Sequence, residues 1–299
     1  MKKLYFIVVI VSLILMSCSN NDEIKDIEPV EVDENTNVIE NDSTDNLPVE
    51  DIVDDKVIYI KDLELEKLIR EEINKPDGDL LMSDMALIED IYIDFAENPV
   101  YEIQGLEYAI NLEVFCFSNG TLKSLNPISQ SKKLYFLDIS YAEIEDQIEI
   151  FDNPILDNVS FTDVNVSDYS FLMNSNEITN LIISGCNIEN IDFIVNMDKL
   201  KVLILEDNRI SDIKSIEGKQ FLEWLNLHGN EITEIEVLST CESLVNLNLS
   251  YNNLTNIEPL FNLENLEELV IYEELDYRLI SRESIKKMQN KGVSVSYTE

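Results

Sequence analysis

The chain has 299 residues, with 60 acidic and 21 basic side chains and a formal net charge of −39. This imbalance argues against nucleic acid as a partner, because phosphates are bound by Lys and Arg that displace their counterions. Hydrophobic residues make up 45% of the chain, which is enough for a folded core and unlike a wholly disordered acidic protein. With a single histidine, metal sites built from several histidines are excluded. No metal and no cofactor are predicted.

The N-terminal residues have the pattern of an export signal. Two lysines precede an apolar run over residues 4–16, which is too short to span a bilayer as a helix. The following run, Leu15-Met16-Ser17-Cys18, resembles the bacterial lipoprotein box. The resemblance implies that residues 1–17 are a cleaved signal peptide and that Cys18 carries a lipid, which would anchor the protein to a membrane at the bacterial cell surface. Ordinary cleavage without lipid is the alternative.

An acidic segment follows the signal. Residues 19–56 contain 14 Asp or Glu, two Lys and no aromatic residue. Such a composition cannot bury enough apolar surface to fold. We therefore expect residues 18–56 to be the lipidated cysteine followed by a disordered tether that holds a folded domain away from the membrane.

Most of the remaining chain repeats with a period of 22 residues. With Leu112 as position 1 of a unit, apolar residues recur at positions 1, 4, 6, 11, 14 and 17. In the eight complete units counted from residue 90, only Asp90 and Gln147 break this pattern. Every step is taken to be 22 residues, so Asp90 is predicted to be equivalent to Leu112. The further equivalents of Leu112 are Leu134, Leu156, Ile178, Leu200, Leu222, Leu244 and Leu266.

The clearest units carry a known motif. One reads Leu200-x-x-Leu203-x-Leu205-x-x-Asn208-x-Ile210, and the next two repeat it from Leu222 and from Leu244. This resembles the leucine-rich repeat family, and the period resembles its bacterial internalin-type subclass. The resemblance implies an α/β right-handed solenoid over residues 90–271, with a parallel concave sheet, an irregular or 3₁₀ convex side and a helical N-terminal cap. Between residues 120 and 175 the position-9 asparagine is missing, so this part is expected to be the least regular.

A solenoid needs caps, because its end coils would otherwise expose their core. Residues 57–89 are the predicted N-terminal cap, with a helix over 62–75. Residues 272–299 are the predicted C-terminal cap. There Ser281 is expected to begin a short helix that ends at Gly292, and 293–297 could add an edge strand.

The predicted binding surface is the concave face of the sheet. Positions 3, 5, 7 and 8 of each unit should project there, and exposed aromatic residues are typical anchors of protein interfaces. The alternative is that these side chains only stabilise neighbouring strands. The candidates for partner binding are Tyr92, Phe136, Tyr141, Trp224, His228, Tyr251 and Tyr272.

Other chemistry is weakly indicated. Glu206, His228 and Ser250 occupy position 7 of successive units and would point outward side by side, which is the composition of a catalytic triad without its geometry. Cys116 is expected on the concave face as a half-exposed filler or a reactive thiol, and Cys186 is expected to be structural. Asp94 and Asp138 are possible but unsupported calcium ligands.

These inferences converge on a surface protein that is not an enzyme. We predict a monomeric, lipid-anchored leucine-rich repeat protein that binds a protein partner through its concave face. Since the domain is so acidic, a basic surface on the partner is expected. The alternatives are a carbohydrate-binding surface protein and, remotely, a hydrolase that uses Glu206, His228 and Ser250.

Overall fold

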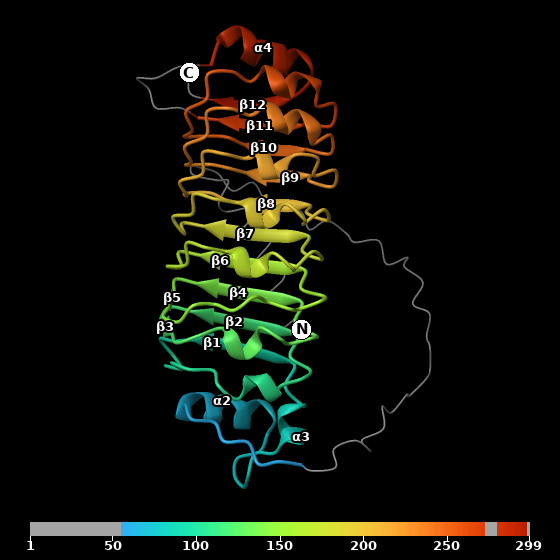
Figure 1. Ribbon diagram of the computed structural model, residues 1–299. Helices are drawn as coiled ribbons and strands as arrows, with labels where there is room; N and C mark the ends of the chain where they lie inside the picture. The colour runs from blue at the N-terminus through green and yellow to red at the C-terminus, as the bar shows by residue number, and fades with distance from the viewer. Residues whose placement is uncertain (1–54, 273–279, 298–299) are drawn as a thin grey trace, which may run out of the picture. The chain divides into compact units, whose positions relative to one another are not determined.

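The computed structural model describes residues 55–272 and 280–297. The predicted signal peptide, Cys18 and the tether as far as residue 54 lie outside the described residues. The described chain forms a solenoid whose strands stack in chain order into one parallel sheet (Figure 1), as the repeat predicts. The strands of this sheet are β1 (Asp90–Asp94), β2 (Val114–Ser118), β4 (Phe136–Ser140), β6 (Asn158–Thr162), β7 (Asn180–Ser184), β8 (Val202–Ile204), β9 (Trp224–Asn226), β10 (Asn246–Asn248), β11 (Glu268–Ile271) and β12 (Ser294–Tyr297).

The side opposite the sheet is built from short 3₁₀ helices, which Figure 1 shows in front of the strands. The leucines and isoleucines of the repeat fill the space between the two sides. Leu203, Leu205 and Ile210 of one coil, for example, are fully buried. This arrangement confirms the predicted leucine-rich repeat solenoid. The 3₁₀ helices are η2 (Leu106–Tyr108), η3 (Asn126–Ile128), η4 (Ser170–Leu172), η5 (Asp192–Ile194), η6 (Lys214–Ile216), η7 (Glu236–Thr240) and η8 (Glu258–Asn262).

Asparagines at position 9 bond adjacent coils to one another. The Asn230 amide nitrogen donates to the carbonyls of Leu205 (2.8 Å) and Leu227 (3.1 Å), and its oxygen accepts the N–H of Ile210 (3.0 Å). Asn208 and Asn252 make equivalent bonds. These side chains satisfy backbone groups that the turn leaves unpaired inside the solenoid.

The coils that lack this asparagine were expected to be the least regular, but their strands are regular. Their strands β4 and β6 have five residues each, whereas β8 to β10 have three. In place of the asparagine, backbone groups pair directly between β3 (Thr121–Leu122) and β5 (Glu143–Ile144). The prediction is therefore wrong for the sheet. It holds for the convex side, where the described coil that contains Gln147 forms no 3₁₀ helix.

The first coil is longer than predicted. Asp90 pairs with Val114, and Ile91 pairs with Phe115, so the step between β1 and β2 is 24 residues. The predicted equivalence of Asp90 with Leu112, and the equal length of all coils, are therefore wrong. Ile88 is fully buried two residues before Asp90, where position 1 of this coil falls.

The N-terminal cap is a helix tied to the first coil. Helix α2 (Leu63–Glu72) begins at Asp62, whose Oδ1 accepts the N–H groups of Glu64 and Leu65. The other oxygen, Oδ2, accepts the N–H of Tyr101 at 2.8 Å in the first coil. The helix ends three residues before the predicted boundary at residue 75, because Asn74 is left-handed (φ 53°) and Pro76 follows. A short helix, α3 (Met82–Met85), completes the cap.

The C-terminal cap has the expected elements. Helix α4 (Arg282–Asn290) begins at Ser281, whose hydroxyl accepts the N–H of Ser284 at 3.1 Å. Gly292 (φ 96°) turns the chain into β12, which pairs with β11 along all four residues. Within the described residues, the helices are too short or too polar to cross a bilayer.

The central coils contain a buried hydroxyl with only a weak polar partner. Tyr169 lies among Phe161, Phe171 and Phe193, with ring centroids 5.0 to 5.9 Å away. Its hydroxyl makes no well-formed hydrogen bond and faces the thiol of Cys186, which is a poor hydrogen-bonding group. A buried hydroxyl that is not well satisfied is unfavourable. We expect Tyr169→Phe to raise the free energy of unfolding by about 1 kcal/mol in urea titrations. Tyr59→Phe, at an exposed position, is the control and should change nothing. A lower stability of Tyr169→Phe would contradict this explanation.

Candidate binding surface

The structure divides the seven predicted binding residues between different parts of the sheet. Trp224 and Phe136 occupy the first positions of their strands, and Tyr92 lies in the middle of β1. By the corrected register Tyr92 pairs with Cys116, so it occupies position 5 rather than position 3. The other four lie at or just beyond the carboxyl ends of their strands. They are Tyr141, His228, Tyr251 and Tyr272.

The residue at position 8 has the same backbone conformation in every coil from residue 119 to residue 251. Each has a positive φ, and its N–H donates to the position-7 carbonyl of the next coil at 2.7–3.1 Å. A positive φ suits Gly, Asn and Asp and is unfavourable for bulky side chains. Five of the seven residues follow this rule, and two are tyrosines. The seven are Asn119, Tyr141, Asp163, Gly185, Asp207, Gly229 and Tyr251.

Tyr141 and Tyr251 are therefore strained residues at the carboxyl edge of the sheet. Their φ values are 52° and 53°, and their side chains are 60% and 50% exposed. A left-handed conformation costs an ordinary residue on the order of 1 kcal/mol. An exposed tyrosine gains little from burial to offset this cost. Strained residues are enriched at functional sites.

Three of the candidate residues form one cluster. The rings of His228 and Tyr251 lie 5.0 Å apart in an edge arrangement, and the Tyr251 N–H donates to the Tyr272 carbonyl at 2.8 Å. The His228 Nε2 lies 3.8 Å from Asp207 Oδ1. Tyr272 is 42% exposed. We call His228, Tyr251 and Tyr272 the edge cluster.

Trp224 does not belong to the edge cluster. It lies four residues before His228 on the same coil, which corresponds to about 13 Å along an extended chain. It is only partly exposed, beside Val202 and Asn246 of the adjacent strands. The structure thus places Trp224 at the amino edge of the sheet and Tyr141, Tyr251 and Tyr272 at the carboxyl edge.

The proposed triad lacks the geometry of a hydrolase. Ser250 is fully buried, and its Oγ accepts the N–H of Tyr272 at 3.0 Å. Glu206 accepts a bond from the Asn226 amide at 2.7 Å. The expectation that Glu206, His228 and Ser250 project outward side by side is therefore wrong, because Ser250 turns inward to hold the next coil. Asn226 is a buried polar neighbour that the sequence analysis missed.

Cys116 and Cys186 are both shielded from solvent. Cys116 is buried rather than half exposed, and burial raises the pKa of its thiol well above the usual value, with the Asp138 and Asp90 carboxylates adding to the shift. A thiol that stays protonated is a poor nucleophile. Cys186 is also buried, and its Sγ lies 3.6 Å from the Phe161 carbonyl, so it takes the place of the asparagine in its coil. It is structural, as predicted.

Asp138 lies on the sheet in the strand after Cys116, and its side chain accepts a hydrogen bond from Ser160. Burial raises its pKa to about 6, although the bond from Ser160 opposes this shift. Because the folded-state pKa lies above the unfolded value, the ionised carboxylate destabilises the fold. This loss is absent below the unfolded value of 3.8, grows as the pH rises from there to the folded-state pKa of about 6, and is constant above it.

We therefore expect Asp138→Asn to raise the free energy of unfolding by about 1–2 kcal/mol at pH 7.5 and to leave it unchanged at pH 4. Urea titrations at both pH values measure this difference. The control is Asp146→Asn, at an exposed carboxylate. An effect of Asp138→Asn that is equal at both pH values would contradict the assignment.

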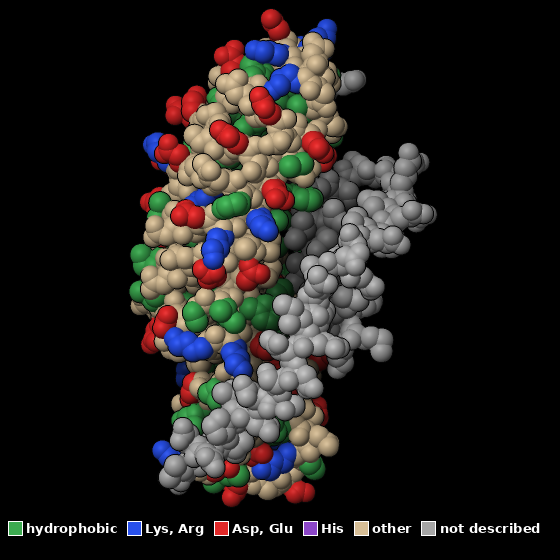
Figure 2. All heavy atoms as spheres, turned by 90° about the vertical axis from the view of Figure 1, so that its right-hand side faces the viewer, with side chains coloured by type: hydrophobic (Ala, Val, Ile, Leu, Met, Phe, Trp, Pro, Cys, Tyr) green, Lys and Arg blue, Asp and Glu red, His purple; other side chains and the backbone are tan. Residues whose placement is uncertain are grey.

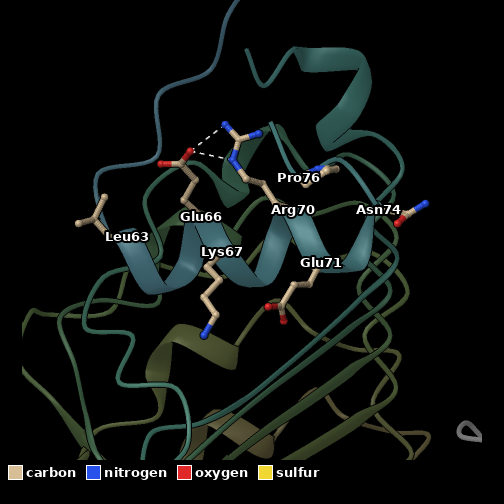
Figure 3. A pocket seen from close by; sticks show the side chains of 7 residues that line it. All are labelled: Leu63, Glu66, Lys67, Arg70, Glu71, Asn74 and Pro76. Carbon is tan, nitrogen blue, oxygen red and sulfur yellow. Dashed lines mark hydrogen bonds and ion pairs between the residues drawn. The ribbon is translucent and has the colours of Figure 1, made fainter. Parts of the chain in front are cut away.

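The candidate residues are not part of a metal cluster in the described chain. In residues 55–272 and 280–297, no three His, Cys, Asp or Glu side chains gather to hold a metal ion. One open hollow lies along α2, far in sequence from the sheet candidates (Figure 3). Its side chains point out from the helix, and Glu66 pairs with Arg70 at 2.8 Å. Because these two charged side chains already pair with each other, we interpret the hollow as an ordinary helix surface and not as a binding site.

Comparisons with known proteins agree with this architecture. Residues 220–262 match the family model for leucine-rich repeats in two copies. No curated protein matches the chain significantly. Among solved structures, internalin C2 of Listeria monocytogenes is similar, with 18% identity, a TM-score of 0.57, and coverage of 79% of this chain and 93% of that one. The functional domain of InlJ from Listeria monocytogenes, described as including a cysteine ladder, is also similar, with 14% identity, a TM-score of 0.51, and coverage of 79% and 59%. The chain therefore has the internalin-type leucine-rich repeat fold.

Proposed function

We propose that the chain is a non-enzymatic binding protein that holds a protein partner at the carboxyl edge of its sheet. The observation that carries this proposal is the pair of exposed tyrosines, Tyr141 and Tyr251, in left-handed conformations that glycine or asparagine would adopt without strain. Tyrosine is enriched in protein interfaces because it combines a large apolar ring with a polar hydroxyl. The two positions are five coils apart, which corresponds to about 24 Å across the sheet, a span suited to a protein surface.

The other candidates belong to the same proposal. His228 and Tyr272 extend the contact at Tyr251, whereas Tyr92, Phe136 and Trp224 would extend it across the sheet. The net charge of −39 favours a partner with a basic surface. The lipoprotein-like N-terminus, with Cys18 as the lipidation site, would place the domain on the bacterial cell surface. The proposed form of the protein is a monomer.

A stability measurement separates function from folding at these tyrosines. We expect Tyr141→Asn to raise the free energy of unfolding by about 0.5–1 kcal/mol, because asparagine tolerates a left-handed backbone. Urea titration followed by circular dichroism measures the change. Tyr108→Asn, at a partly exposed tyrosine of η2 with no positive φ, should not stabilise the protein. Destabilisation by Tyr141→Asn would show that this tyrosine is retained for folding.

Binding is tested by capture from extracts of bacterial and animal cell surfaces. The purified full-length protein, the double variant Tyr141→Asn/Tyr251→Asn and the control Tyr108→Asn are immobilised at equal density. We expect the native protein and the control to retain the same protein at low salt and to release it at high salt, while the double variant retains at least tenfold less. Capture of a polysaccharide instead, or equal capture by the double variant, would overturn the proposal.

A further inference from the structure

The stretch 280–297, which contains helix α4 and β12, differs in charge from the rest of the chain. Residues 280–297 contain four basic side chains and one acidic side chain, whereas the whole chain carries a net charge of −39. Figure 2 shows several basic side chains at the end of the solenoid that carries α4. This stretch is therefore a local concentration of basic side chains in an acidic chain. The basic residues are Arg282, Lys286, Lys287 and Lys291.

Two of these residues hold the helix on the solenoid, and the other two line a hollow. Lys287 lies over the ring of Phe261, with its Nζ 3.8 Å from the ring centroid, and Lys291 donates to the Phe261 carbonyl. Arg282 and Lys286 instead line a hollow beside α4, together with Ile285, Gln289 and Tyr297 of β12. They form no ion pair with another described residue.

The hollow adjoins the last strand of the sheet in the described chain. In the described chain, β12 is the last strand and pairs only with β11. Leu205 and Leu227, at position 6 of their coils, donate their N–H groups to the following strand. Tyr297 is the equivalent residue, since it pairs with position 6 of the preceding coil. Its N–H is therefore directed toward the place where a further strand would lie.

The residues of the edge strand do not themselves block such pairing. Open edges are commonly blocked by lysine, proline or a bulge, and the sequence Ser294–Tyr297 contains none of these residues. The face of α4 that flanks this edge presents Arg282, Lys286 and Gln289, which are spaced as one side of a helix. A strand edge beside a helix is the arrangement by which some domains bind extended peptides.

We propose that the groove between β12 and α4 binds an extended acidic peptide, which adds to the sheet as a further parallel or antiparallel strand. The backbone of β12 supplies hydrogen bonds, and Arg282 and Lys286 meet the carboxylates of the peptide. This site is separate from the tyrosines at the carboxyl edge of the sheet. The occupant is acidic because the groove is basic in an otherwise acidic protein.

The test uses the purified full-length protein and a fluorescent peptide of about seven residues that alternates glutamate with valine and is capped at both ends. Fluorescence anisotropy is expected to show saturable binding that weakens with salt. The same peptide with lysine in place of glutamate should bind at least tenfold more weakly. Arg282→Glu/Lys286→Glu should weaken binding of the acidic peptide at least tenfold. Lys133→Glu, at an exposed lysine of another coil, is the matched control and should weaken it less than twofold.

Strand addition is tested with N-methylated peptides. Methylation of alternate backbone nitrogens in one register should abolish binding, and methylation in the other register should preserve it, because alternate N–H groups of a strand face its partner. Equal binding of both methylated peptides, or no binding of the acidic peptide up to about 1 mM, would overturn the proposal. Sedimentation of the protein without peptide tests whether a second copy of the chain occupies the groove. Self-association that the charge reversal abolishes, without peptide binding, would assign the groove to a second copy.

Discussion

Asn230→Ala is expected to lower the free energy of unfolding by about 3 kcal/mol or more. The amide of Asn230 bonds the carbonyls of Leu205 and Leu227 and the N–H of Ile210, all inside the solenoid. Alanine would leave the Ile210 N–H buried and unpaired, which costs about 1–3 kcal/mol. It would also remove one of the two asparagine hydrogen bonds to each carbonyl, because Leu205 keeps only the bond from Asn208 and Leu227 keeps only the bond from Asn252, and each lost bond costs about 0.5–1.5 kcal/mol. Urea titration followed by circular dichroism measures the loss.

The control for this substitution is Asn174→Ala, at an exposed asparagine. It should change the free energy of unfolding by less than about 0.5 kcal/mol. Asn208 makes the same contacts one coil earlier, so Asn208→Ala should resemble Asn230→Ala. Equal and small effects at residues 174, 208 and 230 would show that the asparagines do not hold the coils together.

Gly120→Ala is expected to lower the free energy of unfolding by about 2 kcal/mol, as overpacking commonly does. A Cβ at Gly120 would lie 2.1 Å from Cγ of Phe95, which is far inside contact distance. Phe95 is fixed against Phe117, with their ring centroids 6.4 Å apart. The extra length of the first coil places this ring over the position that asparagine occupies in later coils.

A double-mutant cycle assigns the clash to this ring. Because Cβ of Phe95 would also lie 2.5 Å from the added methyl group, the background is Phe95→Gly, which removes both the ring and this Cβ. There Gly120→Ala should cost less than about 0.5 kcal/mol. The free energies of unfolding of the four proteins give a coupling of about 1.5 kcal/mol or more. Additive losses would contradict the register in which β1 pairs with β2 at a step of 24 residues.

The fold could be predicted from the spacing of leucines because one coil cannot bury its apolar side alone. The longer first coil could not be predicted with the same rule. Ile91, Ile93 and Phe95 alternate with polar residues, and a shift of two residues leaves the same faces of a strand apolar. The residue at position 1 distinguishes the two registers. It is the apolar Ile88 in the observed register and Asp90 in the predicted one.

The binding surface was predicted only in part, because residue type does not show where a side chain lies. Ser250 belongs to position 7, as His228 does, yet it is buried under the next coil. The strained backbone at Tyr141 and Tyr251 could have been predicted from the sequence. Gly, Asn or Asp occupies position 8 in the other coils from residue 119 to residue 251, and this preference predicts a left-handed backbone throughout the column.

The measurement that tests the central claim most directly is site-specific photocrosslinking on intact cells. Benzoylphenylalanine replaces Tyr251 in one protein and the partly exposed Tyr108 of η2 in a second. If the carboxyl edge of the sheet binds a protein, light should join position 251 to a protease-sensitive adduct of defined mass, and position 108 should give none. Adducts of equal yield at both positions, or a protease-resistant adduct at position 251, would contradict the account.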